Sequence, residues 1–195
     1  MTPRERLLEM LATRSARRGT FTLSSGRTSD LYIDARLTTL SPDGLATIGP
    51  LALATMHEAG WIADAVGGLT MGADPVACAI AHASALAGTP LRAFTVRKEA
   101  KAHGTGKLVE GPFRPGDRVV VLEDTITTGA SALRAVTAVR AEGGSVLGVL
   151  ALVDREEGGR QALEAAGLRV IALTCAAEIV ARMQESKPAT LESPR

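Results

Sequence analysis

One stretch, from Val119 to Ser131, constrains the fold of this chain more than any other. It begins with an apolar and β-branched run, Val119 to Leu122, of the kind that forms a buried strand in a parallel sheet. The carboxylates of Glu123 and Asp124 follow, then a turn rich in threonine and glycine, and then apolar residues at helical spacing from Ala130. A strand, a polar loop and a helix in this order predict an α/β sheet with the loop at its carboxyl edge.

The same stretch also predicts a ligand. The start of a helix presents free backbone N–H groups, and the hydroxyls of Thr125, Thr127 and Thr128 add further donors for a phosphate. The two carboxylates in front would repel that phosphate, but they suit the hydroxyls of a sugar or a metal-bound sugar. We therefore infer a ligand with a phosphate and a ribose, in preference to a strand that merely ends in a polar loop.

The stretch resembles the motif with which type I phosphoribosyltransferases bind phosphoribosyl diphosphate (PRPP): an apolar strand, two acids, then Thr-x-Thr-Thr-Gly. The motif is specific for this superfamily. It is nevertheless shared by enzymes for many substrates and by a few regulators that bind PRPP without catalysis. The choice among them depends on the rest of the chain.

A cationic run follows the strand that we predict from Leu91 to Val96. It reads Arg-Lys-Glu-Ala-Lys-Ala-His-Gly-Thr-Gly-Lys over residues 97–107. Most such runs are solvated loops, but this one concentrates cations and a histidine directly after an apolar strand, as a loop that closes over a polyphosphate would. It is not a nucleoside-triphosphate loop, because Leu108 stands where Ser or Thr is required. The run closely resembles the catalytic loop of orotate phosphoribosyltransferases, and purine-specific relatives do not share it.

A turn beginning Asp154-Arg155 follows the predicted strand from Val146 to Val153. It could simply be a polar turn that begins a helix. An arginine at this edge can also pair with a carboxylate in a forked geometry. Orotate phosphoribosyltransferases carry Asp-Arg-x-Glu at this place, and the resemblance implies that Arg155 holds the carboxylate of orotate.

Two other segments are expected near the ligand. A glycine-rich turn at residues 67–75 follows the strand predicted from Ala63 to Val66, and the resemblance places this turn beside the diphosphate, with Thr70 and the backbone as donors. The strands predicted around residues 21–23 and 31–34 resemble the hood of orotate phosphoribosyltransferases, although Ser24 replaces a lysine that many members carry, and Arg27 is the candidate substitute. Phe21 and Tyr32 together suggest a flat apolar surface, either core or a platform for a ring, and the sequence alone favours core.

Composition limits the classes of function. The formal net charge of +1 gives no sign of a nucleic-acid partner, and the apolar stretches are too short to span a membrane. The N-terminus has no apolar signal core, so we expect the cytoplasm. Cys78 and Cys175 are predicted to be buried free thiols, and His57 and His82 to be structural or surface residues of helices.

The fold that we predict is an α/β, Rossmann-like, mostly parallel sheet of five strands, which begin near residues 63, 91, 118, 146 and 168. We expect a single domain over residues 1–195. Residues 1–40 would form a small hood with an N-terminal helix, 41–185 the core, and 186–195 a tail. The first helix has a capping box at Thr2 and Glu5, and Gly19 is its predicted end.

The resemblance covers nearly the whole chain and implies an orotate phosphoribosyltransferase, which makes orotidine 5′-phosphate and diphosphate from orotate and PRPP in pyrimidine synthesis. It implies Mg²⁺ held mainly by substrate oxygens and water, and a homodimer in which the 97–107 loop reaches the partner's site. The residues implied as catalytic are Lys101, His103 and Asp124. Those implied for PRPP are Arg97, Lys98, Lys101, His103, Glu123, Asp124, Thr125, Ile126, Thr127, Thr128, Gly129, Ala130 and Ser131, and those for orotate are Thr127, Arg155, Tyr32 and Ile33.

Two alternatives stay open. The nearer is a phosphoribosyltransferase for another base, which would have no use for Arg155 or for this cationic loop. The farther is a regulator that binds PRPP without turnover, for which we would expect a DNA-binding segment or a broken loop.

Overall fold

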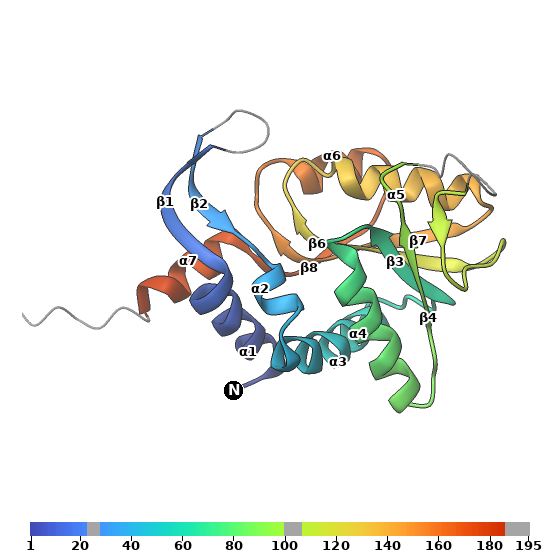
Figure 1. Cartoon of the computed structure of the whole chain (residues 1–195), viewed down its shortest axis with the longest axis horizontal. Coiled ribbons are helices and arrows are strands. Elements are labelled where there is room, and N and C mark those ends of the chain that lie inside the picture. The colour runs from blue at the N-terminus through green and yellow to red at the C-terminus, as the bar shows by residue number, and fades with distance from the viewer. Residues whose placement is uncertain (23–27, 100–106, 186–195) are drawn as a thin grey trace, which may run out of the picture.

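The computed structural model describes residues 1–22, 28–99 and 107–185. Its main sheet has the strand order β5-β4-β3-β6-β7-β8 (Figure 1). The five strands predicted from sequence are present and parallel: β3 (Ala65–Leu69), β4 (Arg92–Val96), β6 (Arg118–Ile126), β7 (Ser145–Asp154) and β8 (Val170–Cys175). The sixth strand, β5 (Val109–Glu110), pairs antiparallel with β4. It was not predicted, because two residues are too few to show a sequence periodicity.

Helices cover both faces of the sheet. Side chains of β6 alternate between two apolar clusters, since successive residues of a strand point to opposite faces. Val119 and Val121 pack with α5 (Ala130–Ala141) and α6 (Gly159–Ala165). Val120 and Leu122 pack with α1 (Pro3–Met10), α3 (Pro42–Glu58), α4 (Ala73–Leu86) and α7 (Ala176–Glu185). The central strand is therefore buried on both sides, as its apolar run predicted.

The hood consists of β1 (Ala16–Thr22) and β2 (Thr28–Ile33), which form a separate antiparallel pair at one side of the main sheet (Figure 1). The capping box at Thr2 and Glu5 is confirmed. The predicted helix end at Gly19 is wrong: α1 ends at Met10, a π-helical turn covers Leu11–Ser15, and Gly19 lies within β1. Strand β1 runs through Gly19 in spite of its local stop signal, and the register with β2 shifts around this glycine, between Arg18 and Phe21.

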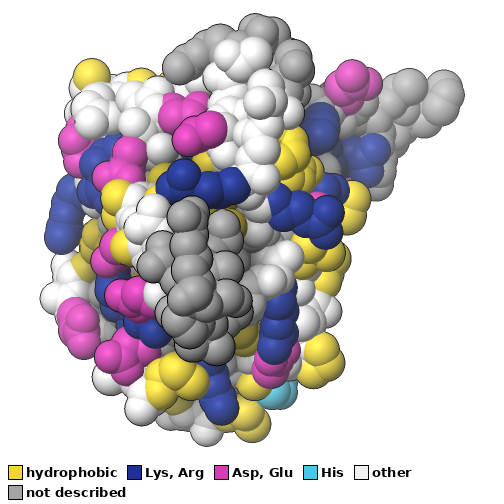
Figure 2. Space-filling model, turned by 90° about the vertical axis from the view of Figure 1, so that its left-hand side faces the viewer, with side chains coloured by type: hydrophobic (Ala, Val, Ile, Leu, Met, Phe, Trp, Pro, Cys, Tyr) yellow, Lys and Arg dark blue, Asp and Glu magenta, His cyan; other side chains and the backbone are white. Residues whose placement is uncertain are grey.

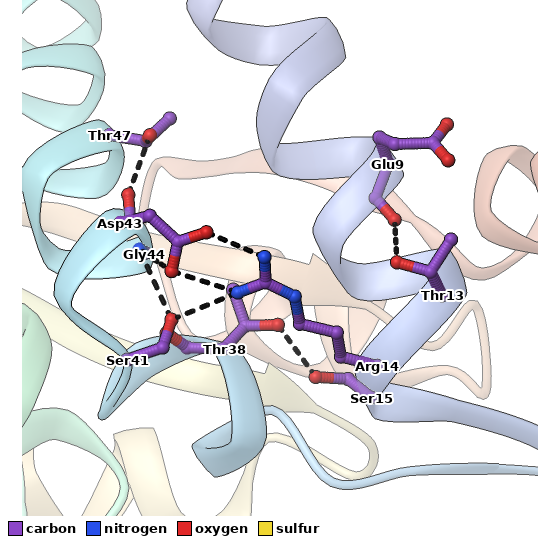
Figure 3. A network of polar contacts seen from close by, with 9 residues as sticks. All are labelled: Glu9, Thr13, Arg14, Ser15, Thr38, Ser41, Asp43, Gly44 and Thr47. Atoms are coloured by element: carbon purple, nitrogen blue, oxygen red, sulfur yellow. Dashed lines mark hydrogen bonds and ion pairs between the residues drawn. The ribbon is translucent and has the colours of Figure 1, made fainter.

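A polar network holds the base of the hood against α3 (Figure 3). Arg14 donates to both carboxylate oxygens of Asp43, at 2.8 and 2.6 Å. The hydroxyls of Ser15 and Thr38 are 2.8 Å apart in a buried position, and Thr38 belongs to the short helix α2 (Arg36–Thr39). Ser41 accepts from the N–H of Gly44 and so caps α3, which begins at Pro42. These contacts fix the hood relative to the core.

Other element boundaries differ from those predicted. Gly67 and Gly68 are buried within β3 and do not belong to the following turn. A Cβ added at Gly67 would lie 2.1 Å from the carbonyl oxygen of Phe94, and one added at Gly68 would lie 2.1 Å from that of Leu122. The close approach of strands thus explains these glycines better than a turn does. Strand β6 continues past Leu122 to Ile126, since Glu123 and Thr125 pair with β7.

The described surface carries charge of both signs. Figure 2 shows basic and acidic side chains interspersed on the side of the hood and of α1 and α7. Ion pairs such as Arg4–Glu178, at 2.6 Å, join them. Cys78 is exposed, so its predicted burial is wrong, while Cys175 is half-buried. Within the described ranges, none of the helices has the length and apolar character needed to cross a membrane.

Candidate active site

The predicted site lies between β3 and β6, where the direction in which successive strands are added to the sheet reverses. The chain passes from β3 outward to β4, then returns to place β6 on the other side of β3. Helices α4 and α5 start beyond the carboxyl ends of β3 and β6, and this divergence opens a crevice in sheets of this type. A cavity of about 850 Å³ occupies the position. Its lining comes from the hood, the turn after β3, the residues after β4, and the ends of β6 and β7.

Most of the residues predicted from sequence meet in this cavity. Those that line it are Tyr32, Ile33, Lys98, Glu123, Asp124, Thr125, Thr127, Thr128, Ser131 and Arg155. Ile126 contributes no side chain, because it is buried in the apolar core. Arg97 lines an adjoining cavity that shares Thr70 and Lys98 with this one. Lys101 and His103 lie outside the described residues, as do Ser24 and Arg27.

The two acids lie on the floor of the cavity and are poorly solvated. Glu123 is 7% exposed, and burial together with the neighbouring Asp124 raises the pKa of Glu123 to about 8. Burial also raises the pKa of Asp124, although the backbone N–H of Thr125, 2.7 Å from Oδ1, and the charge of Arg36 act in the opposite direction. The pair therefore holds a proton on Glu123 near neutral pH. Its oxygens can accept hydrogen bonds from sugar hydroxyls.

The turn after β6 is built to leave helix N–H groups open. Gly129 has a φ of 79°, a left-handed conformation that favours glycine, and it precedes α5. It gives the helix no side-chain cap, and the N–H of Ala130 makes only a long hydrogen bond, of 3.4 Å, to Thr128 Oγ1. A Cβ at this position would also lie 2.9 Å from the carbonyl oxygen of Gly159. The geometry therefore fits an anion between Thr127, Thr128 and Ser131.

Arg155 links the hood to the core. Its Nη2 donates to Glu157 Oε1 at 2.7 Å, to the carbonyl oxygen of Leu31 at 3.0 Å and to Ser29 Oγ at 3.2 Å. The side chain is only 5% exposed, and its buried Nε has no hydrogen-bond partner. A buried, unpaired donor in a cavity wall is uncommon, and it marks a place where a ligand acceptor would be stabilised.

Tyr32 is not the core residue that the sequence alone favoured. The residue is 39% exposed, and its ring centroid lies 5.3 Å from that of Phe21. The two aromatic residues thus form a surface at the hood side of the cavity, and Tyr32 itself lines it. An exposed ring beside a cavity can stack against a planar ligand.

Sequence reasoning missed the lining residues Asp34, Ala35, Arg36 and Glu157, whereas the turn that it expected near the ligand contributes Leu69, Thr70, Met71 and Gly72. Arg36 pairs with Asp34 through two bonds, of 2.8 and 3.0 Å, and brings a positive charge near Asp124. The sequence signal that could have identified Arg36 is the Asp-x-Arg pattern directly after the hood strand β2. Gly72 abuts Asp124, since a Cβ there would lie 2.7 Å from its carboxylate. That contact spans 52 positions of sequence and could not be read from a local pattern.

The donor set of the cavity is compatible with a metal that is held mainly by substrate. Among residues 1–22, 28–99 and 107–185, no group of three or more Asp, Glu, His or Cys side chains is placed to hold a metal ion. The site does offer two hard oxygen donors, Glu123 and Asp124, next to the expected ribose hydroxyls. Mg²⁺ is commonly bound in this way, through one or two carboxylates, water and phosphate oxygens.

Comparison with known proteins identifies the family. No family model matches the chain. It is 45% identical over 183 residues to the orotate phosphoribosyltransferase of Aquifex aeolicus, which covers 92% of this chain and 99% of that protein. It is 52% identical over 168 residues to the orotate phosphoribosyltransferase of Mycobacterium tuberculosis H37Rv, covering 85% and 90%. The crystal structure of the latter in complex with PRPP superposes with a TM-score of 0.78, at 45% identity over 91% of this chain and 99% of that one. With relatives this similar over most of its length, the chain belongs to the orotate phosphoribosyltransferase family of pentosyltransferases.

Proposed function

We propose that the cavity at the ends of β3 and β6 is where the chain transfers the phosphoribosyl group of PRPP to orotate. In this reaction the bond between C1 of the ribose and the diphosphate breaks, and a bond from that carbon to a ring nitrogen of orotate forms. Positive charge develops on the ribose ring while diphosphate departs. The protein's task is to align the two substrates and to stabilise the charge on the leaving group.

The 5′-phosphate is assigned to the turn and helix start after β6. Thr125, Thr127, Thr128 and Ser131 supply hydroxyls, and Gly129 and Ala130 supply backbone. Ile126 fixes this turn by its burial in the core. The ribose hydroxyls are assigned to Glu123 and Asp124, which directly precede this turn in the chain and line the same cavity.

The diphosphate is assigned to the space between the turn after β3 and the cations after β4. Lys98 lines both cavities there, and Arg97 lines the outer one. Lys101 and His103 are the further residues for this role, and one of them would donate a proton to the leaving diphosphate. Mg²⁺, when bound, would neutralise diphosphate and ribose oxygens. We also propose a homodimer whose 97–107 loops serve the partner's sites, and a cytoplasmic location.

Orotate is assigned to the hood side, between Tyr32, Ile33, Thr127 and Arg155. The observation that carries this assignment is the buried Arg155 guanidinium, whose Nε lacks a partner. A carboxylate would accept from that donor and add a second charge partner beside Glu157. Bases without a carboxylate, such as uracil, would lack this charged hydrogen bond, which costs binding energy.

Substitution of Arg155 tests this assignment. We expect Arg155→Gln to raise the orotate KM by at least tenfold, the size of losing a charged hydrogen bond, and to leave the dissociation constant of PRPP nearly unchanged. Steady-state kinetics and PRPP titration measure the two effects.

Because Arg155 also ties the hood to the core, Ser29→Ala serves as the matched control. It removes one contact of Arg155 and keeps the charge, so its orotate KM should stay within about twofold of the unmodified protein. An unchanged orotate KM in Arg155→Gln would remove this residue from carboxylate binding.

A further inference from the structure

The turn after β3 is hydrogen-bonded to the carboxylate of Asp74, a residue that sequence reasoning did not single out. Asp74 lies in the first turn of α4 and accepts a hydrogen bond from Thr70 Oγ1 at 2.7 Å. Its other oxygen accepts from Thr95 Oγ1, on β4. Asp74 therefore joins the turn at residues 70–72 to the strand from which Arg97 and Lys98 extend.

These bonds change the role expected for Thr70. Its hydroxyl donates to Asp74, and its backbone N–H donates to the carbonyl oxygen of Val96 at 2.8 Å. Both of its donors are thus committed within the protein, so Thr70 has none left for an anion. The donors that can face the cavity are the backbone N–H groups of Met71 and Gly72, the next two residues of the turn.

A second contact limits the turn on its other side. Gly72 lies so close to Asp124 that a Cβ would come within 2.7 Å of the carboxylate. The turn is therefore bounded by Asp124 on the side of the ribose acids and by the Asp74–Thr95 link on the side of β4. A carboxylate beside a polyphosphate site would be unfavourable if it faced the ligand. Asp74 instead has an oxygen engaged by each threonine hydroxyl.

We propose that Asp74 is a positioning residue for the reaction. Through Thr70 and Thr95 it sets the distance between the turn and β4. The backbone N–H groups at 71–72 and the cations at 97–98 thereby converge on one diphosphate. This inference rests on the proposed placement of the diphosphate between those two segments.

Three variants test the proposal: Asp74→Asn, Thr95→Val and the double variant. Asp74→Asn and Thr95→Val should each raise the KM of PRPP, and the KM of diphosphate in the reverse reaction, by roughly tenfold, the size of losing one hydrogen bond to a charged group. The orotate KM should stay within about twofold. The KM values of PRPP and diphosphate should be no higher in the double variant than in Asp74→Asn alone, because both substitutions break the same link between Asp74 and Thr95.

A matched control separates positioning from folding. Thr137 Oγ1 donates to the carbonyl oxygen of Leu133 on the exposed side of α5, so Thr137→Val removes a hydroxyl bond away from the cavity. It should leave all KM values unchanged. If active Asp74 and Thr95 variants kept the diphosphate and PRPP KM values, or if their losses simply added, the positioning role would be refuted. Failure of the unmodified protein to turn over orotate would instead refute the proposed function.

Discussion

At the residue scale, the buried pair Glu123 and Asp124 decides how the site behaves with pH. Burial raises the pKa of Glu123 to about 8, so the free protein holds this carboxyl protonated at neutral pH. In the unfolded chain the same group ionises near its ordinary value. The folded state therefore binds more protons than the unfolded state between about pH 4.5 and 8, and this group's contribution to stability falls as pH rises through that window.

We accordingly expect Glu123→Gln to flatten the fall of stability between pH 5 and pH 8. Chemical denaturation across this range measures the effect. A slope that is equally steep in the variant would show that Glu123 is not the group responsible.

Ligand binding should favour the ionised form of Glu123 over the protonated form that the free protein holds. Ribose hydroxyls that donate to Glu123, and positive charge close to it, favour the ionised form, so PRPP with Mg²⁺ should release a proton at pH 7. Calorimetry in buffers of different ionisation enthalpy counts that proton. Release that persists undiminished in Glu123→Gln would assign the proton to another group.

At the scale of elements, the sequence predicted most where one local pattern determines one structure. The apolar run, acids, threonines and glycine after residue 119 predicted the start of β6, the turn after it and α5. Gly19 and Gly67 were misread, because β1 runs through Gly19 and the close approach of Phe94 places Gly67 within β3. The roles of Asp74, Arg36 and Gly72 were not foreseen, since they depend on partners that only the fold brings close.

Two neighbouring residues of the turn after β7, Arg155 and Glu156, have different roles. Arg155 faces the cavity, whereas Glu156 Oε2 accepts from the N–H of Ala177 at 2.9 Å and so caps α7. Glu156 has a φ of 58°, a left-handed conformation that is unfavourable for residues other than glycine. The cap therefore compensates for strained backbone.

We predict that Glu156→Ala lowers the free energy of unfolding by about 1 kcal/mol, since it removes the cap and keeps the strain. Glu156→Gly should lose less, because glycine adopts this backbone readily. Thermal and denaturant unfolding measure both variants. A glycine variant that is less stable than the alanine variant would contradict this account.

At the scale of the whole molecule, the proposed homodimer can be tested by mixing two inactive variants, because activity should return only when both are present in one dimer. Subunits with Lys101→Ala lack a functional loop, and subunits with Asp124→Asn lack a functional ribose site. If loops serve the partner's site, each mixed dimer regains one intact site. An equal mixture after subunit exchange should recover roughly a quarter of the unmodified rate, because half of the dimers are mixed. No recovery, with exchange shown independently, would place each loop at its own subunit's site.

The most direct test of the central claim is the base specificity of the purified protein. Absorbance would follow the consumption of orotate with PRPP and Mg²⁺, with uracil, adenine, hypoxanthine and xanthine as parallel substrates. We expect turnover of orotate alone, because its carboxylate is the group assigned to the buried donor of Arg155. Turnover of another base, or PRPP binding without any turnover, would contradict it.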